Sequence, residues 1–488
     1  MLREDGEAFV DDATFLERLE RIVGPEGLRA GRLGRALYRR DASFLNAEPL
    51  AVCAPATVAQ AQQVVRLCRE ASVPFTPRGA GTGLAGGAVP VAPERAPLVV
   101  ALGRLDRIIH IDPEHRRAWV QPGVPNARLS ERAAPYGLRF APDPASQIAA
   151  TLGGNVATNA GGIHCLSEGV TSAHVLAVEL LGADGELHLL GGDLPEQGGL
   201  DLRGLAVGSE GTFGLVTKAC VRLQPLPPQT RTLLAGFPSA VAAARAVSRI
   251  VTGDTLPAAL ELMDREAVEL VEPYARAGYP MDAEAVLLAE FEGLPAEVAH
   301  GAEAASEACT AEGATSVEIA RTAEHRTKLW KGRKGVAGAI AKRAPDFYLH
   351  DVVVPRSGLA DMLAGVLEIA ADEELLVINV VHAGDGNLHP FLLFDREDPG
   401  VLDRVLRAGH RIVETALAAG GVLTGEHGVG IEKRDLLGDV YSEDDLAVQR
   451  AVRDAMDPSG LANPGKVLPS PQGCAEGTQR LVPEGTWV

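Results

Sequence analysis

The sequence predicts an α+β protein with more than one domain, and three observations support this fold class. The 488 residues exceed the size of one ordinary hydrophobic core. Short apolar runs separated by glycine-rich turns fill residues 71–225, a pattern typical of short strands. After Pro225 a strand–helix–strand pattern occurs twice, which predicts an antiparallel sheet covered by helices.

The N-terminal part is expected to contain two helices before the first strands. Residues 12–22 repeat apolar side chains at helical spacing, and residues 58–70 do the same after Thr57, an expected N-cap. Strands are then expected at PLVVALG, RAWVQPG, VLAVELLGADGELHLL and GLVTKACVRLQPLP.

The prolines at 225, 227 and 228 mark an expected domain boundary. Beyond it, strands are expected at TLLAGF, VLLAEFEG, FYLHDVVVP and LLVINVV. Helices are expected at AVAAARAVSRIV, across 296–310 and at GLADMLAGVLEIAA. Residues 467–488 are rich in proline, glycine and polar residues, which predicts a loose tail.

Composition excludes several classes of protein. The hydrophobic content of 46% suits a soluble globular protein, and no apolar run is long enough to cross a membrane. A balance of 46 basic against 65 acidic residues, a net charge of −19, argues against nucleic acid as a general partner. The acidic N-terminus lacks the apolar core of a secretory signal, and the six cysteines have no iron–sulfur spacing. We therefore expect a reduced, cytoplasmic protein whose iron–sulfur partner, if any, is another chain.

The first glycine-rich loop, PRGAGTGLAGGAVP at 77–90, contains a G-x-G-x-x-G match at Gly81, Gly83 and Gly86. Three prolines by residue 97 prevent a long helix from following, so the dinucleotide-binding Rossmann turn is excluded. The absence of a terminal Gly-Lys-Ser/Thr excludes the Walker A loop. Two interpretations remain: a tight bend between strands, or a nest of backbone N–H groups that binds phosphate.

Two further loops favour the binding interpretation. Residues 142–169 contain the runs LGGN and NAGG, and residues 207–217 read VGSEGTFGLVT. Few structural loops need so many residues without bulk. Three such loops predict an extended ligand that the backbone contacts along much of its length, and a dinucleotide fits this description.

The segment VVHAGDGNLHPF at 380–391 places His382 and His389 on either side of an Asp-Gly pair. If Asp385-Gly386 forms a two-residue hairpin loop, the two histidines lie directly opposite, with Cβ atoms about 5 Å apart. They are then either a polar cross-strand pair near solvent or two ligands of one metal ion. The run TGEHGVG at 424–430 supplies a carboxylate and another histidine, which favours the metal site.

Six motifs occur in an order that resembles one known family. They are PRGAGTGLAGG, LGGNVATNAGG, GSEGTFG, HAGDGNLHP, GEHGVG and NPGK, and they extend over residues 35–468. The sequence resembles FAD-linked oxidases and dehydrogenases of the vanillyl-alcohol oxidase/PCMH superfamily. Within it, the sequence is most similar to the glycolate oxidase flavoprotein subunit and to the D-lactate and D-2-hydroxyglutarate dehydrogenases.

The resemblance implies a PCMH-type FAD-binding domain of two subdomains and an α+β cap domain over the flavin. The implied boundaries are 1–34 for an N-terminal helical segment, 35–226 for the FAD domain, 227–420 for the cap, 421–468 for a segment that returns to the flavin, and 469–488 for the tail.

The resemblance also implies which residues contact the cofactor. The pyrophosphate is expected on Arg78, Gly79, Ala80, Gly81, Thr82 and Gly83, and the flavin and ribityl side near Gly86, Gly87, Thr151, Gly154, Asn155, Thr158 and Gly161. Glu210, Gly211, Gly214 and Val216 are expected near the adenine half, and Asn463 near the isoalloxazine ring. Because Gly81-Thr82-Gly83 lacks the histidine of covalently flavinylated relatives, the FAD is expected to be non-covalent. His164-Cys165 is the other conceivable tether.

The metal and the catalytic groups follow from the same motifs. His382, His389 and Glu426 match the family's metal ligands, and Zn, Mn or Fe would each suit this donor set. His427 matches the base that takes the substrate hydroxyl proton, and Arg333 matches the arginine that binds the substrate carboxylate. Arg326 and Lys328, in the same basic stretch, are expected on a solvated helix face.

The expected reaction is oxidation of a D-2-hydroxy acid by hydride transfer to flavin N5. Ala337 replaces a threonine that the D-2-hydroxyglutarate dehydrogenases use, and no lysine occurs at 345–350. These departures favour a small substrate, glycolate or D-lactate. Electrons would pass to a quinone, an iron–sulfur partner subunit or another carrier, and a homodimer, a complex with partner subunits or a partner-mediated membrane association is compatible with the sequence.

Two alternatives remain at this point. An alkyldihydroxyacetonephosphate-synthase-like transferase would use the same flavin fold without net redox change. A non-catalytic flavin subunit of a glycolate oxidase complex would also preserve the fold, although such subunits typically lack the paired histidines and the GEHG run.

Overall fold

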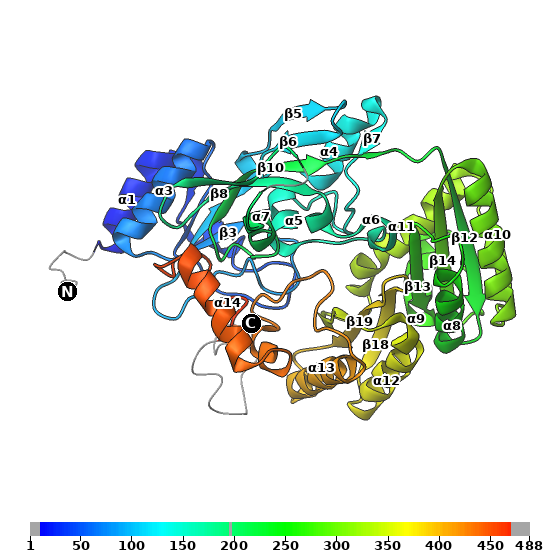
Figure 1. The fold of residues 1–488 in the computed structure, drawn as a ribbon. Coiled ribbons are helices and arrows are strands. Elements are labelled where there is room, and N and C mark those ends of the chain that lie inside the picture. The colour runs from blue at the N-terminus through cyan, green and yellow to red at the C-terminus, as the bar shows by residue number, and fades with distance from the viewer. Residues whose placement is uncertain (1–9, 195–197, 470–488) are drawn as a thin grey trace. The chain divides into compact units, whose positions relative to one another are not determined.

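The computed structural model of the protein describes residues 10–194 and 198–469. The chain forms two compact units (Figure 1). The first contains the residues up to Ala160, Val170–Pro225 and the residues from Glu426 onward; the second contains Gly161–Gly169 and Leu226–Gly425. Residues 1–9 of the predicted N-terminal segment, and all of the predicted tail except its first residue, lie outside the described residues.

The first unit begins with a four-stranded sheet in the order β1-β2-β4-β3. Its parallel strands are β2 (Ala51–Cys53), β3 (Phe75–Arg78) and β4 (Leu98–Ala101), and β1 (Leu28–Arg29) is antiparallel to β2. The predicted helices are confirmed as α1 (Asp12–Val23) and α3 (Val58–Ala71), and the Thr57 side chain caps α3 as expected. The short helix α2 (Arg32–Ala36) lies between them in the chain.

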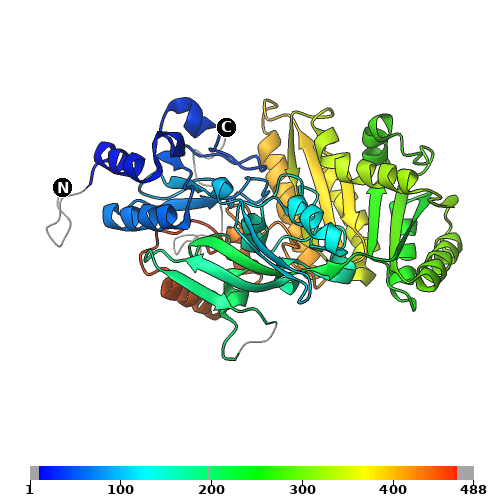
Figure 2. The same cartoon turned by 90° about the horizontal axis from the view of Figure 1, so that it is seen from above.

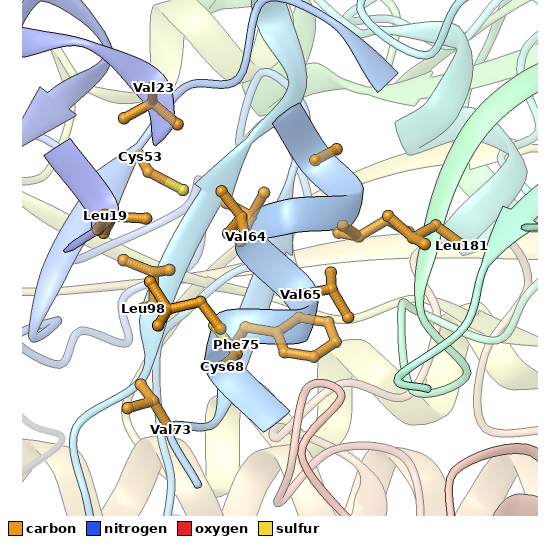
Figure 3. Packing of buried hydrophobic residues seen from close by; sticks show 14 of the residues in the cluster. Leu19, Val23, Cys53, Val64, Val65, Cys68, Val73, Phe75, Leu98 and Leu181 are labelled. Atoms are coloured by element: carbon orange, nitrogen blue, oxygen red, sulfur yellow. The ribbon is translucent and has the colours of Figure 1, made fainter. Parts of the chain in front are cut away.

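Apolar side chains from these elements form one buried cluster (Figure 3). It contains Leu19 from α1, Val64 and Cys68 from α3, and Phe75 from β3. Leu181, from another sheet of the first unit, completes the cluster, so the two sheets of this unit share a core. Full burial of such side chains contributes about 1.5–3 kcal/mol each, which fixes the strand that leads into the first glycine loop.

The second sheet of the first unit is antiparallel, in the order β5-β6-β10-β8-β9. Its strands are β5 (Ile108–Asp112), β6 (Arg117–Val120), β8 (Val175–Leu181), β9 (Leu187–Gly191) and β10 (Leu215–Arg222). A small pair, β7 (Leu138–Arg139) with β11 (Gln224–Pro225), accompanies it. The helices of this part are α4 (Asn126–Ala133), α5 (Leu152–Thr158), α7 (Leu202–Ala206) and α14 (Glu443–Met456).

The second unit contains one antiparallel sheet in the order β15-β12-β14-β13-β18-β19-β16, with β17 also paired to β19. The strands are β12 (Gln229–Phe237), β13 (Ala259–Asp264), β14 (Ala285–Gly293), β15 (Ser316–Ile319), β16 (Asp346–Leu349), β17 (Val352–Val353), β18 (Leu376–His382) and β19 (Asn387–Phe394). The predicted helix-covered antiparallel sheet is thereby confirmed, although β13 was not among the expected strands.

Helices cover this sheet, as the green to yellow part of Figures 1 and 2 shows. They are α8 (Ala240–Val251), α9 (Arg265–Ala275), α10 (Pro295–Ala311), α11 (Ala323–Ile340), α12 (Leu359–Asp372) and α13 (Val401–Ala418); the one-turn α6 (Cys165–Glu168) also belongs to this unit. α8 and α10 pack on β12 and β14, and α12 packs on α8 and α13. No helix among the described residues is long and apolar enough to cross a membrane.

The hairpin of β18 and β19 differs from its predicted register. His382 pairs with Asn387, and His389 pairs with Val380, so the loop is the four residues 383–386. The predicted direct pairing of the two histidines is therefore wrong. Because residues 380 and 382 share a face of β18, His382 and His389 become diagonal neighbours on one face of the sheet.

Candidate functional site

The first glycine-rich loop leaves β3 and folds back over its last residue, Arg78. The buried Arg78 guanidinium carbon lies 5.3 Å from the Tyr38 ring centroid, and Nη1 lies 3.4 Å from the Ala88 carbonyl oxygen. Gly81 has a φ of +72°, and a Cβ there would lie 2.1 Å from Nη2 of Arg78. Burial lowers the pKa of Arg78, an effect that Asp41 opposes. The loop therefore needs glycine at 81 in order to close over a buried cation.

The second loop lies against the first. The Thr151 side chain caps α5 by accepting the Gly154 amide at 3.4 Å, and a Cβ on Gly79 would lie 2.4 Å from Thr151 Oγ1. Thr158 Oγ1 donates to the Gly154 carbonyl at 3.1 Å. Asn155 is buried and receives a hydrogen bond of 3.4 Å from Asn126. The structure thus brings together Gly79 and the predicted residues of α5.

Glu210, in the third loop, bonds directly to two other segments of the first unit, and one of them also bonds to the first loop. Its Oε1 accepts the Val429 amide at 2.6 Å and its Oε2 accepts the Gly430 amide at 2.9 Å. The Asn463 side-chain amide donates to the Glu210 carbonyl at 2.7 Å and to the Gly87 carbonyl at 2.9 Å. Glu210 therefore fixes the segment that directly follows the GEH run, a role that its place in a glycine motif did not reveal.

The surroundings of Glu210 contain buried charges of both signs. Burial raises the pKa of Glu210 to about 7, against the opposing effects of the Gly430 and Val429 amides and of Lys466. Burial likewise lowers the pKa of Lys466 to about 7, and Glu210 opposes that shift. Lys433 is also buried, at 1% exposure. The structure places both lysines in the interior of the first unit.

The residues of these loops fit a dinucleotide. Asn463 Oδ1 is buried and has no hydrogen-bond partner in the described part of the chain, so it can accept a bond from a ligand. Gly83 has open space around its missing Cβ, with only Asp41 Oδ2 within 4 Å, at 3.9 Å. Val216 is buried on β10. Gly214 lies so near the Leu181 carbonyl oxygen that a Cβ at this position would clash with it. The contacts of these residues with a cofactor remain predictions.

The remaining predicted cofactor residues lie in the same three loops, with one exception. Ala80, Thr82, Gly86, Gly87 and Gly211 belong to the first unit. Gly161 belongs to the short segment of the second unit. In that segment the Cys165 sulfur accepts a hydrogen bond from the Gly162 amide at 3.0 Å. His164 lies beside a carboxylate of the second unit's sheet.

In the second unit, His382 and His389 form an edge-to-face pair. Their ring centroids are 5.0 Å apart with an interplanar angle of 85°. Both side chains are buried, at 8% and 7% exposure, which disfavours the interpretation of a polar pair near solvent. The diagonal relation across β18 and β19 brings the rings together even though the predicted register is wrong.

Each imidazole has a carboxylate beside it. His382 Nδ1 lies 2.6 Å from Glu261 Oε1 on β13, and His389 Nε2 lies 3.3 Å from Asp351 Oδ1. A carboxylate on one ring nitrogen orients a histidine whose other nitrogen binds a metal, so the donor set fits a divalent cation. Sequence reasoning missed both carboxylates. Glu261, an acidic residue inside the apolar run ALELMD, was the available signal.

Asp351 also fixes the chain that precedes the predicted third ligand. It is fully buried and accepts the Thr424 hydroxyl at 2.7 Å and the Gly425 amide at 2.9 Å. Glu426 and His427 follow directly; both are partly buried and belong to the first unit. Their predicted roles as ligand and base remain predictions.

Arg333 lies beside the histidine pair. It is 6% exposed on α11 and forms an ion pair with Glu261, and its Nη2 lies 3.5 Å from His382 Nδ1. An arginine held by one carboxylate retains further N–H donors, so it can bind a substrate carboxylate beside the imidazoles. Arg333 is thus buried and does not lie on a solvated face of α11.

The predicted solvated position holds only in part for Arg326, whose side chain is 39% exposed but paired with a buried carboxylate. Its Nε donates to Glu290 Oε2 at 2.9 Å, and Glu290, on β14, also accepts bonds from Thr232 and from Trp330 Nε1. His164 Nε2 lies 3.7 Å from Glu290 Oε1. Burial raises the pKa of Glu290, but the nearby His164 and the hydrogen bonds from Arg326 and Thr232 outweigh it and lower that pKa to about 2. Lys328, by contrast, is half-exposed and pairs with Glu324 at 3.0 Å.

Two family models match the chain. The model described as "FAD binding domain" matches residues 49–191, and the model described as "FAD linked oxidases, C-terminal domain" matches residues 226–467. The first match contains two of the three glycine loops, and the second contains the histidine pair, Arg333 and the GEHG run.

Several curated proteins are similar to this chain over most of both sequences. Glycolate oxidase subunit GlcD of Escherichia coli K12 is 42% identical over 89% of this chain and 86% of its own. The protein of the same name from Bacillus subtilis is 37% identical over 93% and 96%. D-lactate dehydrogenase of Anaerostipes hadrus is 32% identical over 87% and 91%.

Solved structures share the fold at low sequence identity. A 4-ethylphenol oxidase from Gulosibacter chungangensis has a TM-score of 0.78 at 19% identity and covers 96% of this chain and 99% of its own. P-cresol methylhydroxylase has a TM-score of 0.77 at 17% identity, covering 93% and 96%. An alkyldihydroxyacetonephosphate synthase has a TM-score of 0.73 at 18% identity, covering 94% and 86%. At these identities the likeness shows the PCMH-like fold and not the reaction.

Proposed function

Because the chain belongs to the FAD-linked oxidases that include glycolate oxidase subunit GlcD and the D-lactate dehydrogenases, we propose that it oxidises a small D-2-hydroxy acid, glycolate or D-lactate, to the 2-oxo acid. One observation carries this proposal beyond the family. Arg333, a carboxylate-binding side chain, and the imidazole of His382 share the carboxylate of Glu261. A substrate with a carboxylate next to a hydroxyl needs these two kinds of group side by side.

FAD, when bound, accepts the hydride from the substrate carbon. The residues proposed to hold it are those of the three glycine loops, with Asn463 Oδ1 as an acceptor for a ligand N–H group. The backbone amides of the loops bind and orient the cofactor, and the small side chains leave room for it. Glu210 holds the segment from Val429 to Gly430 in place.

A divalent metal, when bound, lowers the pKa of the substrate hydroxyl. His382, His389 and Glu426 are proposed to hold it, and Glu261 and Asp351 orient the two imidazoles. Arg333 binds the substrate carboxylate and so fixes which face of the carbon is presented. His427 takes the hydroxyl proton as general base, since the hydride can leave only as that proton is removed.

The substrate is proposed to be small, because the chain lacks the side chains that hold a second carboxylate in the dicarboxylate-specific relatives. Ala337 lies on α11 one turn after Arg333 and offers no hydroxyl. The electrons are proposed to leave through partner subunits of a glycolate oxidase complex in the cytoplasm, as the name of the GlcD relatives suggests.

The proposal is tested by anaerobic mixing of the purified flavoprotein with glycolate, D-lactate, L-lactate and D-2-hydroxyglutarate in separate experiments. Rapid loss of the oxidised flavin absorbance is expected with glycolate or D-lactate, and slow or no loss with L-lactate and D-2-hydroxyglutarate. An oxidised flavin that remains unchanged with every D-2-hydroxy acid would overturn the proposal.

A further inference from the structure

The second unit contains a cavity that the oxidation chemistry does not use. It has a volume of about 870 Å³ and lies where β12, β15 and the start of α11 meet. We infer that it binds a small molecule with several negative charges, such as a phosphorylated or polycarboxylic compound. The inference concerns a site separate from His382, His389 and Arg333, none of which lines the cavity.

The cavity has a positive lining in an acidic protein. Arg231, Arg321 and Arg326 line it, and Glu318 is the one carboxylate among its lining residues. Because Arg326 is paired with Glu290, two positive charges without an ion pair in the described part of the chain face one negative charge. The whole chain, by contrast, carries a net charge of −19. A concave surface of one sign concentrates ions of the opposite sign, because its field lines converge there.

Two of the three arginines have their charge available. In the described ranges neither Arg231, which is partly buried, nor Arg321, which is exposed, forms an ion pair with a carboxylate, whereas Arg326 is paired with Glu290 at 2.9 Å. A guanidinium group offers five N–H donors and binds phosphate or carboxylate in a bidentate manner. The cavity thus presents two guanidinium groups without an ion pair to any described residue, together with a third that is paired with Glu290.

The backbone of β12 and the start of α11 also contribute to the cavity. β15 pairs with β12 only at Leu233–Gly236, and the Ala320 amide then reaches the Thr232 carbonyl at 2.8 Å. Residues 229–231 of β12, which line the cavity, therefore have no strand partner on that side among the described residues. Thr322 and Ala323, at the start of the 18-residue helix α11, also line it and add the positive end of the helix dipole.

These features select the ligand class. Polar side chains and three guanidinium groups suit phosphate or carboxylate oxygens better than an apolar molecule. Two arginines without an ion pair among the described residues favour a ligand with at least two anionic groups over a monoanion. Inorganic pyrophosphate and citrate are therefore suitable probes, one for each source of negative charge.

The test is calorimetric titration of the FAD-loaded protein with pyrophosphate and, separately, with citrate at constant ionic strength. Saturable binding of at least one probe is expected in the wild type. The Arg231→Gln/Arg321→Gln double variant should bind it at least about tenfold more weakly, because two groups that form charge-assisted hydrogen bonds with the anion are lost. Flavin reduction by the hydroxy acid should be unchanged in the absence of the probe.

Arg343→Gln is the matched control, because Arg343 is exposed and forms no ion pair within the described ranges. It should bind the probe as the wild type does. Arg321→Glu, a single change at an exposed position, provides a second test in case the double variant folds poorly. Equal affinity in the wild type, the double variant and Arg321→Glu, or no binding of either probe to the wild type, would overturn the inference, whatever the outcome of the hydroxy-acid experiment.

Discussion

The orientation of the histidine pair depends on single residues, and Glu261 is one that contacts both His382 and Arg333. It is 1% exposed and bonds both His382 and Arg333. In Glu261→Gln the orienting charge is lost, so metal affinity should fall by about 10–100-fold, as it does for orienting carboxylates in general. Titration of the metal-free protein with Zn²⁺ or Mn²⁺ measures this change. Glu269→Gln, at an exposed position of α9, is the control; equal affinities in both variants would contradict the role of Glu261.

His427 is the residue whose function the motif alone predicts. In His427→Ala the FAD content should stay at the wild-type level, while flavin reduction by substrate should slow by about 10²–10⁴-fold because the general base is missing. Anaerobic stopped-flow absorbance measures this rate. His410→Ala removes a partly exposed histidine that pairs with Glu414 at 3.1 Å and should react normally. A wild-type rate in His427→Ala would remove His427 as the base.

Single residues also show what sequence reasoning could not reach. Arg333 was found because it matches a family motif, whereas Glu261 and Asp351 were missed because no local pattern separates them from other acidic residues. Their roles come from strand pairing: Glu261 is opposite His382 only because β13 pairs with β18, more than a hundred residues later in the chain. Such long-range register is not contained in the spacing of nearby residues.

At the scale of elements, the β18–β19 hairpin depends on Gly386. This residue has a φ of +82°, and a Cβ would lie 2.2 Å from the Val354 carbonyl oxygen. Gly386→Ala should therefore destabilise the protein by about 1–3 kcal/mol, the usual cost of strained backbone. Thermal unfolding measures the effect. Gly338→Ala, in open space on α11, should leave the melting temperature unchanged or raise it. Similar behaviour of the two variants would contradict this account.

The same hairpin shows why element existence was easier to predict than register. The apolar run LLVINVV and the Asp-Gly pair predicted a hairpin of two strands, and both strands are present. The loop is nonetheless four residues long, because the Gly386 carbonyl also accepts the Val354 amide at 3.0 Å, a partner that the local sequence does not reveal. The predicted helices at 12–22 and 58–70 were more accurate, since helix caps and helical periodicity are local signals.

At the scale of the whole molecule, the fold class could be predicted because motif order is a property of the complete chain. The assignment of distant segments to the same unit could not be predicted from the sequence. The 161–169 segment, which the sequence associates with the glycine loops, belongs to the second unit, and His164 there approaches Glu290 and Glu292 of β14. The chain passes from the first unit to the second at residue 161, and no change in composition there indicates this boundary.

The two units should respond differently to acid. The pKa of Glu290 in the second unit is lowered from 4.5 to about 2, so its stabilising effect is complete above pH 4.5 and is lost as the pH falls through that interval. A shift of this size corresponds to about 3 kcal/mol. The pKa of Glu210 in the first unit is raised from 4.5 to about 7, so protonation of this carboxyl favours the folded state as the pH falls.

Acidification should therefore loosen the second unit before the first, in a transition that is not two-state. Hydrogen exchange measured by mass spectrometry at pH 7 and at about pH 3 should show earlier loss of protection in β12 and β14 than in β3 and β4. Glu290→Gln should be less stable at pH 7 and should lose most of this pH dependence, because the titrating group is absent. Glu368→Gln, at an exposed position of α12, should keep the wild-type profile. Simultaneous loss of protection in both units, with the same profile in Glu290→Gln, would show that the Glu290 network does not control acid stability.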